Sequence, residues 1–317
     1  MLDAALKASR LRDDAAAFHL WACNETDLRG LLSTSSPSLN SELSYMTRSQ
    51  RAVLKQIEEL ASYYFSGAWR NAVVKPRTSL LIAGPSGVGK SHIVRHFVHQ
   101  HGLKLLRLTY GDWLPAGSRG DRHTLDIVSD FVRENQRGVI FIDELDKISR
   151  GFQNEWTACI LNELYGMLDR TCFDGAPSCP RRHQAAKRLK EGVFLVGAGT
   201  WQDMWERTRR TVRTVGFSVQ EELPTRTQIG DSAVIPTELL NRFSPGLGML
   251  EPMKAEDFAE ALKADSIDSR ARDLGLAVDL HAAEASFLQM RWVEHLALNV
   301  AIAEAERSPG KRSRLGV

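Results

Sequence analysis

The amino-acid sequence predicts an α/β fold in which helices flank a parallel sheet and an all-helical region follows at the C-terminus. Two observations lead to this prediction. Short apolar runs typical of buried parallel strands alternate with helical patterns, and these runs are Ser79–Ala83, Leu103–Leu108, Gly138–Ile142 and Val193–Val196. From about Pro252 the strand patterns stop and only helical patterns follow.

The length of the chain, 317 residues, allows a large domain and a smaller companion, because single cores usually stop growing near 250–300 residues. We expect an N-terminal helical extension and linker over residues 1–50, a large α/β domain over 51–251, and a small helical lid over 252–317 with a basic tail. The polar run Ser33–Ser38 is typical of a linker.

The helical elements are predicted from spacing and from breaker residues. A long amphipathic stretch begins at Arg51, and Pro76 breaks the chain before the first strand. The next helix is expected to begin near Lys90, after a glycine-rich turn. In the lid, helices are predicted over Asp257–Leu274, Ala282–Gln289 and Met290–Ala305.

The glycine-rich turn after the first strand carries a chemical signature. The pattern G-x-x-x-x-G-K-[ST] is formed by Gly84, Pro85, Ser86, Gly87, Val88, Gly89, Lys90 and Ser91. Its glycines let backbone N–H groups turn inward around phosphates, and Lys90 brings a positive charge to the β and γ phosphates. A turn could match by accident, but the strand before it and the amphipathic helix after it lie where phosphate binding requires them. The pattern predicts a nucleoside triphosphate site with Ser91 as a ligand of Mg²⁺.

A pair of acids, Asp143 and Glu144, ends the buried run Val139–Ile142. Ligands of open α/β sheets bind at the carboxyl ends of the strands, so these acids are expected beside the phosphates. Asp143 would hold Mg²⁺ through water, and Glu144 would polarise the attacking water. Taken alone, the run is better interpreted as a strand ending in an acidic turn, but its position downstream of the phosphate loop favours the catalytic interpretation.

This ordered series resembles the AAA+ ATPases and, within them, the ClpX and HslU unfoldases. The resemblance covers roughly residues 51–306, and its most specific marks are the phosphate loop and the run Asp143–Ile148, which is similar to the DE-x-DK segment of that clade. The resemblance implies a P-loop NTPase sheet with a helical lid, Mg²⁺ and ATP as bound species, and hydrolysis of ATP to ADP and phosphate. It also implies a homohexamer or spiral with each nucleotide between neighbours, and remodelling or unfolding of a protein partner.

The resemblance assigns three further site residues. Thr200 matches the polar sensor 1, which reports the γ-phosphate, although a glycine-rich turn with a capping threonine explains it equally well. Arg242, near the end of Ile235–Phe243, matches the arginine finger that reaches the γ-phosphate on a neighbouring subunit; the alternative is a helix-end arginine on a solvated face. Arg291 matches the sensor 2 arginine or is a surface arginine, and it lies in Gln289-Met290-Arg291 where the clade has Gly-Ala-Arg.

Partner-binding segments are less clearly marked. The resemblance places a substrate-gripping loop at Tyr110–Gly117, where Tyr110 and Trp113 either contact a polypeptide or pack under the loop. A second, basic loop is expected at Ser178–His183. Val215–Phe217 resembles the tripeptide with which ClpX-type motors dock on a barrel peptidase.

The distribution of charge leaves a second function class open. The formal net charge is only +2, but basic residues cluster over residues 181–213 and in the tail Lys311–Arg314. Such a cluster is usually a solvated face. If it binds a ligand, it favours a nucleotide-switched DNA-binding or regulatory assembly of the transposition or defence type.

The remaining composition points to a cytoplasmic protein. The four cysteines, Cys23, Cys159, Cys172 and Cys179, lack C-x-x-C spacing and a nearby histidine pattern, so we expect reduced thiols rather than a zinc site. No apolar stretch approaches 18 residues, and the N-terminus lacks the features of a signal peptide.

Overall fold

The computed structural model describes residues 45–120, 122–150, 155–174, 180–202, 205, 237–264, 266–285 and 289–307, all of which belong to one compact unit, Tyr45–Val317. Several sequence predictions lie outside the described residues: the extension up to residue 44, Ser178 and Cys179 of the basic loop, most of the basic segment beyond residue 202, Val215–Phe217, Ile235 and Pro236, and the basic tail.

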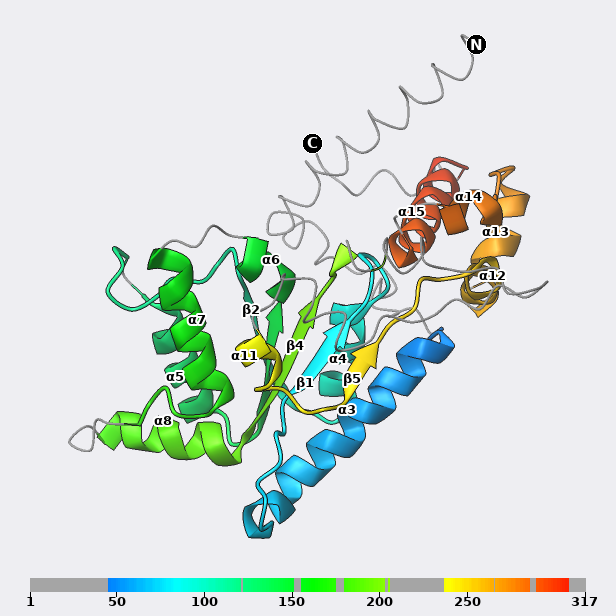
Figure 1. The fold of residues 1–317 in the computed structure, drawn as a ribbon. Helices are drawn as coiled ribbons and strands as arrows, with labels where there is room; N and C mark the ends of the chain where they lie inside the picture. The colour runs from blue at the N-terminus through cyan, green and yellow to red at the C-terminus, as the bar shows by residue number, and fades with distance from the viewer. Residues whose placement is uncertain are drawn as a thin grey trace, which may run out of the picture. The chain divides into compact units, whose positions relative to one another are not determined.

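Five strands form a parallel sheet in the order β2-β3-β4-β1-β5 (Figure 1). The strands are β1 (Leu80–Ala83), β2 (Lys104–Thr109), β3 (Gly138–Asp143), β4 (Val193–Gly199) and β5 (Leu247–Met249). The predicted α/β class with a parallel sheet is therefore confirmed. The sequence did not predict β5, because three residues beside a Pro-Gly turn are too few to establish a strand pattern.

Helices cover both faces of the sheet (Figure 1). The helices of this part are α3 (Arg48–Ser66), α4 (Lys90–Gln100), α5 (Thr124–Glu134), α6 (Leu145–Arg150), α7 (Glu155–Leu168), α8 (Pro180–Glu191) and α11 (Thr237–Leu240), with a 3₁₀ turn at Ala68–Asn71. Successive strand side chains point to opposite faces. Leu80 and Ile82 accordingly pack with α3 and α4, whereas Leu81 and Ala83 pack with α5, α7 and α8.

The C-terminal region is helical, as predicted, but its first helix is interrupted. The helices are α12 (Ala255–Ala264), α13 (Ile267–Asp273), α14 (Leu280–Ala285) and α15 (Met290–Arg307). The expected single helix over 257–274 is wrong, because Ser266 adopts a left-handed φ of 54° that ends the helical path. None of the helices in the described ranges has the length and hydrophobicity needed to cross a bilayer.

The two described cysteines are free thiols in different environments. Cys159 is exposed on α7, whereas burial raises the pKa of Cys172 to about 12. Since only the thiolate is a good nucleophile, iodoacetamide at pH 8 should modify Cys159 well before Cys172. Peptide mass mapping over time, with unfolded protein as the control, checks this order; equal rates in the folded chain would contradict it.

Candidate active site

The phosphate loop joins the end of β1 to the start of α4, and its glycines are needed for geometric reasons. Gly87 and Gly89 have φ values of 80° and 89°, a region that side chains with a Cβ rarely adopt. A Cβ on Gly84 would lie 2.8 Å from the carbonyl oxygen of Leu250. The backbone therefore turns tightly enough to direct its N–H groups inward, as a phosphate cradle requires.

Lys90 is buried inside the loop, with 8% of its surface exposed. Its Nζ donates to the carbonyl oxygens of Gly84 and Pro85, each at 2.7 Å. Burial lowers the pKa of Lys90 to about 8, while the charges of Asp143 and Asp146 act in the opposite direction. Hydrogen bonds to two carbonyl oxygens thus take the place of the water that the buried ammonium has lost. A bound phosphate would give the ammonium a negatively charged partner in place of these carbonyls.

The start of α3 braces the loop from outside. Thr47 and Gln50 form a reciprocal capping box at the N-terminus of this helix. The Gln50 Nε2 donates to the carbonyl oxygen of Val88 at 3.0 Å, and a Cβ on Gly89 would lie 2.7 Å from the same nitrogen. The sequence signature T-x-x-Q could have predicted the cap, but only the fold brings Gln50 to the loop.

The predicted metal ligands lie together. Ser91 Oγ donates to Asp143 Oδ2 at 2.9 Å, which joins the first turn of α4 to the end of β3. Hydroxyl and carboxylate oxygens are the hard donors that Mg²⁺ takes in nucleotide sites, so these residues fit the expected ion. Arg107 of β2 also donates to Asp143 Oδ2, at 2.9 Å, and already supplies positive charge at this oxygen.

Glu144 follows β3 in a strained conformation. Its φ of 62° lies in the left-handed region, which costs about 1–3 kcal/mol for a residue with a side chain and is found mainly at functional sites. The Glu144 N–H donates to Asp143 Oδ1 at 2.9 Å, and its carboxylate pairs with Lys147 at 2.8 Å. The Glu144 side chain is partly exposed, so water can reach its carboxylate, as general-base work requires.

Asp146 fixes Thr200 at the end of β4. Its carboxylate, only 4% exposed, accepts the Thr200 N–H at 3.0 Å and the Thr200 hydroxyl at 2.6 Å. A threonine hydroxyl has one proton to donate. With that proton directed to Asp146, Thr200 can accept a hydrogen bond from a water but cannot at the same time donate one to a phosphate.

Replacing Asp146 with alanine should therefore destabilise the fold by about 1–3 kcal/mol, because two partly buried donors of Thr200 lose their acceptor. It should lower kcat more than ATP affinity, because Thr200 is then no longer held in place at the end of β4. Thr200→Val removes one of the two donors, and the double variant completes a cycle. We expect a coupling of about 0.5–3 kcal/mol from urea unfolding. Additive effects would show that the Asp146–Thr200 contact does not carry the energy.

The helical C-terminal region reaches the phosphate loop at the start of α15. The Met290 N–H donates to the carbonyl oxygen of Gly87 at 3.0 Å. Arg291, in the first turn of α15, lowers the pKa of Lys90 by its charge and so lies within electrostatic reach of the loop. Gln289 has a φ of 50° and anchors this turn by accepting the Met253 N–H at 2.6 Å. Gln289, one of the two residues at which Gln289-Met290-Arg291 differs from Gly-Ala-Arg, thus has a structural role of its own.

Arg242 lies away from the phosphate loop of its own chain. Its Nε donates to Asp169 Oδ2 at 2.8 Å, and its guanidinium lies 4.1 Å from the centroid of the Tyr165 ring. The nearby Ser244 N–H donates to the carbonyl oxygen of Ser79, directly before β1. The phosphate loop follows the other end of β1, so Arg242 and the phosphate loop of the same chain lie toward opposite ends of this strand.

The two aromatic residues of the predicted substrate-gripping loop both pack inward, but to different extents. Trp113 is 3% exposed and donates from Nε1 to Glu163 Oε2 at 2.9 Å, so it packs under the loop. Tyr110 is partly buried and also packs against the core. Two hydrogen bonds close the loop at its base. The Leu114 N–H donates to the Thr124 hydroxyl oxygen at 2.8 Å, and the Thr124 N–H donates to the Leu114 carbonyl oxygen at 2.9 Å.

Sequence reasoning missed four residues of this region: Gln50, Arg107, Asp146 and Asp169. Asp146 stood within the quoted run Asp143–Ile148, and its acidic character beside the catalytic pair was the available signal. Arg107 alternates with apolar residues on a strand and gives no local signal.

Comparison with known families matches residues 80–219 to the model described as ATPase family associated with various cellular activities (AAA). The matched residues include the phosphate loop, the Ser91–Asp143 pair, Glu144 and Thr200. Arg242 and α15 lie beyond them. The match and the geometry of the phosphate loop together support an ATPase of the AAA+ type.

Proposed function

We propose that the protein is a Mg²⁺-dependent AAA+ ATPase that assembles with its own copies into a ring or spiral. Hydrolysis of ATP to ADP and phosphate would drive the remodelling or unfolding of a protein partner. The observation that carries the ATPase proposal is the buried Lys90 beside the Ser91–Asp143 pair, within the residues that match the AAA family.

The roles follow from the contacts of each residue. The phosphate loop, residues 84–91, binds the phosphates through its N–H groups and Lys90. Mg²⁺ held by Ser91 and, through water, by Asp143 would neutralise charge on the phosphates. Glu144 accepts a proton from the attacking water, and Thr200, held by Asp146, accepts a hydrogen bond that orients this water.

The neighbouring copy contributes Arg242 in this proposal. A guanidinium supplied across an interface stabilises the charge that develops on the transferred phosphoryl group. Arg242 is held by Asp169 and lies toward the end of β1 that is opposite its own phosphate loop, which supports a role toward a neighbouring copy. Arg291 would contribute in cis, from the start of α15.

A mixing experiment tests the shared site. Lys90→Ala subunits should not bind ATP but keep Arg242, and Arg242→Ala subunits keep an intact phosphate loop. Each variant alone should be nearly inactive, and mixtures should regain ATPase activity because one kind of interface is then complete. Mixtures that stay as inactive as the separate variants, although they co-assemble in sedimentation, would contradict a site shared between copies.

Mechanical output requires the lid to move. We propose the three-part division into residues 1–50, 51–251 and 252–317, with hydrolysis changing the angle between the large domain and the lid. The Met290–Gly87 hydrogen bond is the contact through which a change in the phosphate loop would reach α15.

Partner remodelling is tested with the protein that Glu144→Gln retains in ATP. That protein, purified and labelled with a fluorophore pair, should unfold faster with wild-type protein and ATP than with ADP. Tyr110 is the aromatic residue of the predicted gripping loop that stays partly exposed, so Tyr110→Ala should slow unfolding and preserve ATP hydrolysis. Identical unfolding in ATP and ADP would rule out a motor acting on that partner.

A DNA-binding regulatory assembly is the second candidate, and helix α8 favours it. Five cationic residues lie on this twelve-residue helix: Arg181, Arg182, Lys187, Arg188 and Lys190. If all five contact phosphates of duplex DNA, DNA affinity should fall by about 500-fold between 50 and 200 mM salt. Arg181→Glu combined with Arg182→Glu should reduce this slope, whereas an unchanged slope would assign α8 to a solvated face.

A further inference from the structure

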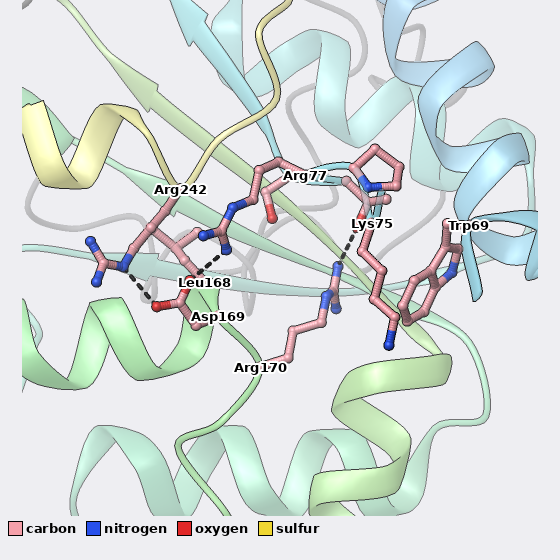
Figure 2. A pocket seen from close by; sticks show the side chains of 10 residues that line it. Trp69, Lys75, Arg77, Leu168, Asp169, Arg170 and Arg242 are labelled. Carbon is pink, nitrogen blue, oxygen red and sulfur yellow. Dashed lines mark hydrogen bonds and ion pairs between the residues drawn. The ribbon is translucent and has the colours of Figure 1, made fainter. Parts of the chain in front are cut away.

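A pocket of about 350 Å³ lies at the end of the sheet where β1 begins. Figure 2 shows that its side chains come from the segment before β1, from the end of α7 and from the residues after α11. Its size is at the lower end of ligand pockets and suits a phosphate group better than a whole nucleotide.

The charge of this pocket is strongly positive. Its lining contains Lys75, Arg77, Arg170 and Arg242 but one acidic residue, Asp169. Arg170 is fully used within the fold, since it donates to the carbonyl oxygens of Leu189 and Val193. The remaining lining carries three cations against one carboxylate, which favours an anionic ligand.

Asp169 holds two of these arginines at once. Its Oδ1 accepts from Arg77 Nη1 at 2.6 Å, and its Oδ2 accepts from Arg242 Nε at 2.8 Å (Figure 2). The Arg77 side chain is 48% exposed and that of Arg242 25% exposed. Arg242 also donates from Nη1 to the carbonyl oxygen of Glu238 at 2.7 Å. Each guanidinium has five donors, so both arginines keep further donors for a ligand after these bonds.

We propose that Arg77 is a second phosphate-binding arginine beside Arg242, and that Asp169 is the residue that positions both. The ligand is the terminal phosphate of ATP bound by a neighbouring copy of the chain, since the phosphate loop of the same chain lies at the other end of β1. Two guanidinium groups on one carboxylate present a pair of forks that matches the oxygens of a phosphate. This inference rests on the proposed function, because it assumes that Arg242 acts on a neighbour.

The test is complementation between subunits. Arg77→Ala should lower kcat for ATP about 10²-fold in assembled protein, as removal of one preorganised donor does elsewhere. Mixing with Lys90→Ala subunits, which carry intact Arg77, should restore activity. Arg133→Gln is the matched control, because it removes an arginine–aspartate pair on α5, to Asp130 at 3.2 Å, and should leave kcat unchanged.

The outcomes separate this inference from the proposed function. If Arg242→Ala is complemented and Arg77→Ala is inactive but not complemented, Arg77 acts within its own fold and the inference is overturned while the shared site stands. Wild-type kcat in Arg77→Ala also overturns it. If neither variant is complemented, the shared site itself fails.

Two further measurements define the ligand and the role of Asp169. Asp169→Asn should lower kcat and leave KM for ATP near wild type, because it frees both arginines without removing them; an unchanged kcat would overturn the positioning role. Calorimetry with sulfate and Lys90→Ala subunits tests whether the pocket binds a free oxyanion from solution. Micromolar binding that Arg77→Ala abolishes would assign the pocket to a free oxyanion and overturn the neighbour's phosphate as its ligand.

Discussion

Glu144→Gln should reduce ATP hydrolysis by about 10²–10⁴-fold and leave ATP binding close to wild type. Glutamine keeps the size of the side chain but cannot accept a proton from water at neutral pH. It also exchanges the ion pair with Lys147 for a neutral contact, while Lys90, Ser91 and Asp143 remain in place. Steady-state phosphate release gives the rate, and a fluorescent ATP analogue gives the affinity.

The control for this variant is Glu59→Gln. Glu59 is exposed on α3 and pairs with Lys55, so its replacement also removes a glutamate–lysine contact but lies outside the proposed site. It should hydrolyse ATP at the wild-type rate. If Glu144→Gln instead loses ATP binding and hydrolysis together, Glu144 acts in binding and another group activates the water.

Local patterns were sufficient to predict the parallel sheet and the phosphate loop. Leu80–Ala83 is a continuous apolar run because helices bury both of its faces, and this is the signal by which a central parallel strand differs from a half-exposed one. The loop was predictable because Gly87 and Gly89 must adopt left-handed backbone angles. Each of these signals is contained in a few consecutive residues.

The contacts that complete the site depend on residues far apart in the chain. Asp146 and Thr200 are separated by 54 positions, and Gln50 and Val88 by 38. A buried acid that accepts from a threonine has no characteristic spacing, since the distance along the chain is set by the intervening helices. The run Asp143–Ile148 contains Asp146, but the sequence could not show that this acid holds Thr200.

The same limit applies at the pocket lined by Arg77, Asp169 and Arg242. The resemblance singled out Arg242, but it gave no reason to connect it with Arg77 or Asp169, which lie 165 and 73 positions away. The two arginines meet only because residues before β1 and after α7 reach the same end of the sheet. Short strands gave a related difficulty, since β5 was found only through its pairing with β1.

Arg170 gave no sequence signal, yet its replacement should have the largest effect on stability. Its guanidinium is buried and donates to the Tyr64 hydroxyl and to the carbonyls of Leu189 and Val193, and its charge lies 4.4 Å from the centroid of the Tyr64 ring. Burial lowers the pKa of Arg170, but an arginine stays charged in proteins, so these contacts must replace its hydration.

Arg170→Ala should lower the free energy of unfolding by about 3–5 kcal/mol, because buried carbonyls lose their donor and a cavity forms. Domains are typically stable by only about 5–15 kcal/mol, so the loss should appear as a large shift in the urea midpoint. Arg170→Gly separates the backbone strain from the lost side-chain contacts, since the native φ of 60° is strained for alanine and not for glycine. The glycine variant should therefore be the more stable of the two by about 1 kcal/mol.

Tyr64→Phe, which removes only the hydroxyl that Arg170 contacts, should cost about 1–3 kcal/mol. A loss below about 1 kcal/mol in Arg170→Ala would mean that water replaces the guanidinium at these carbonyls.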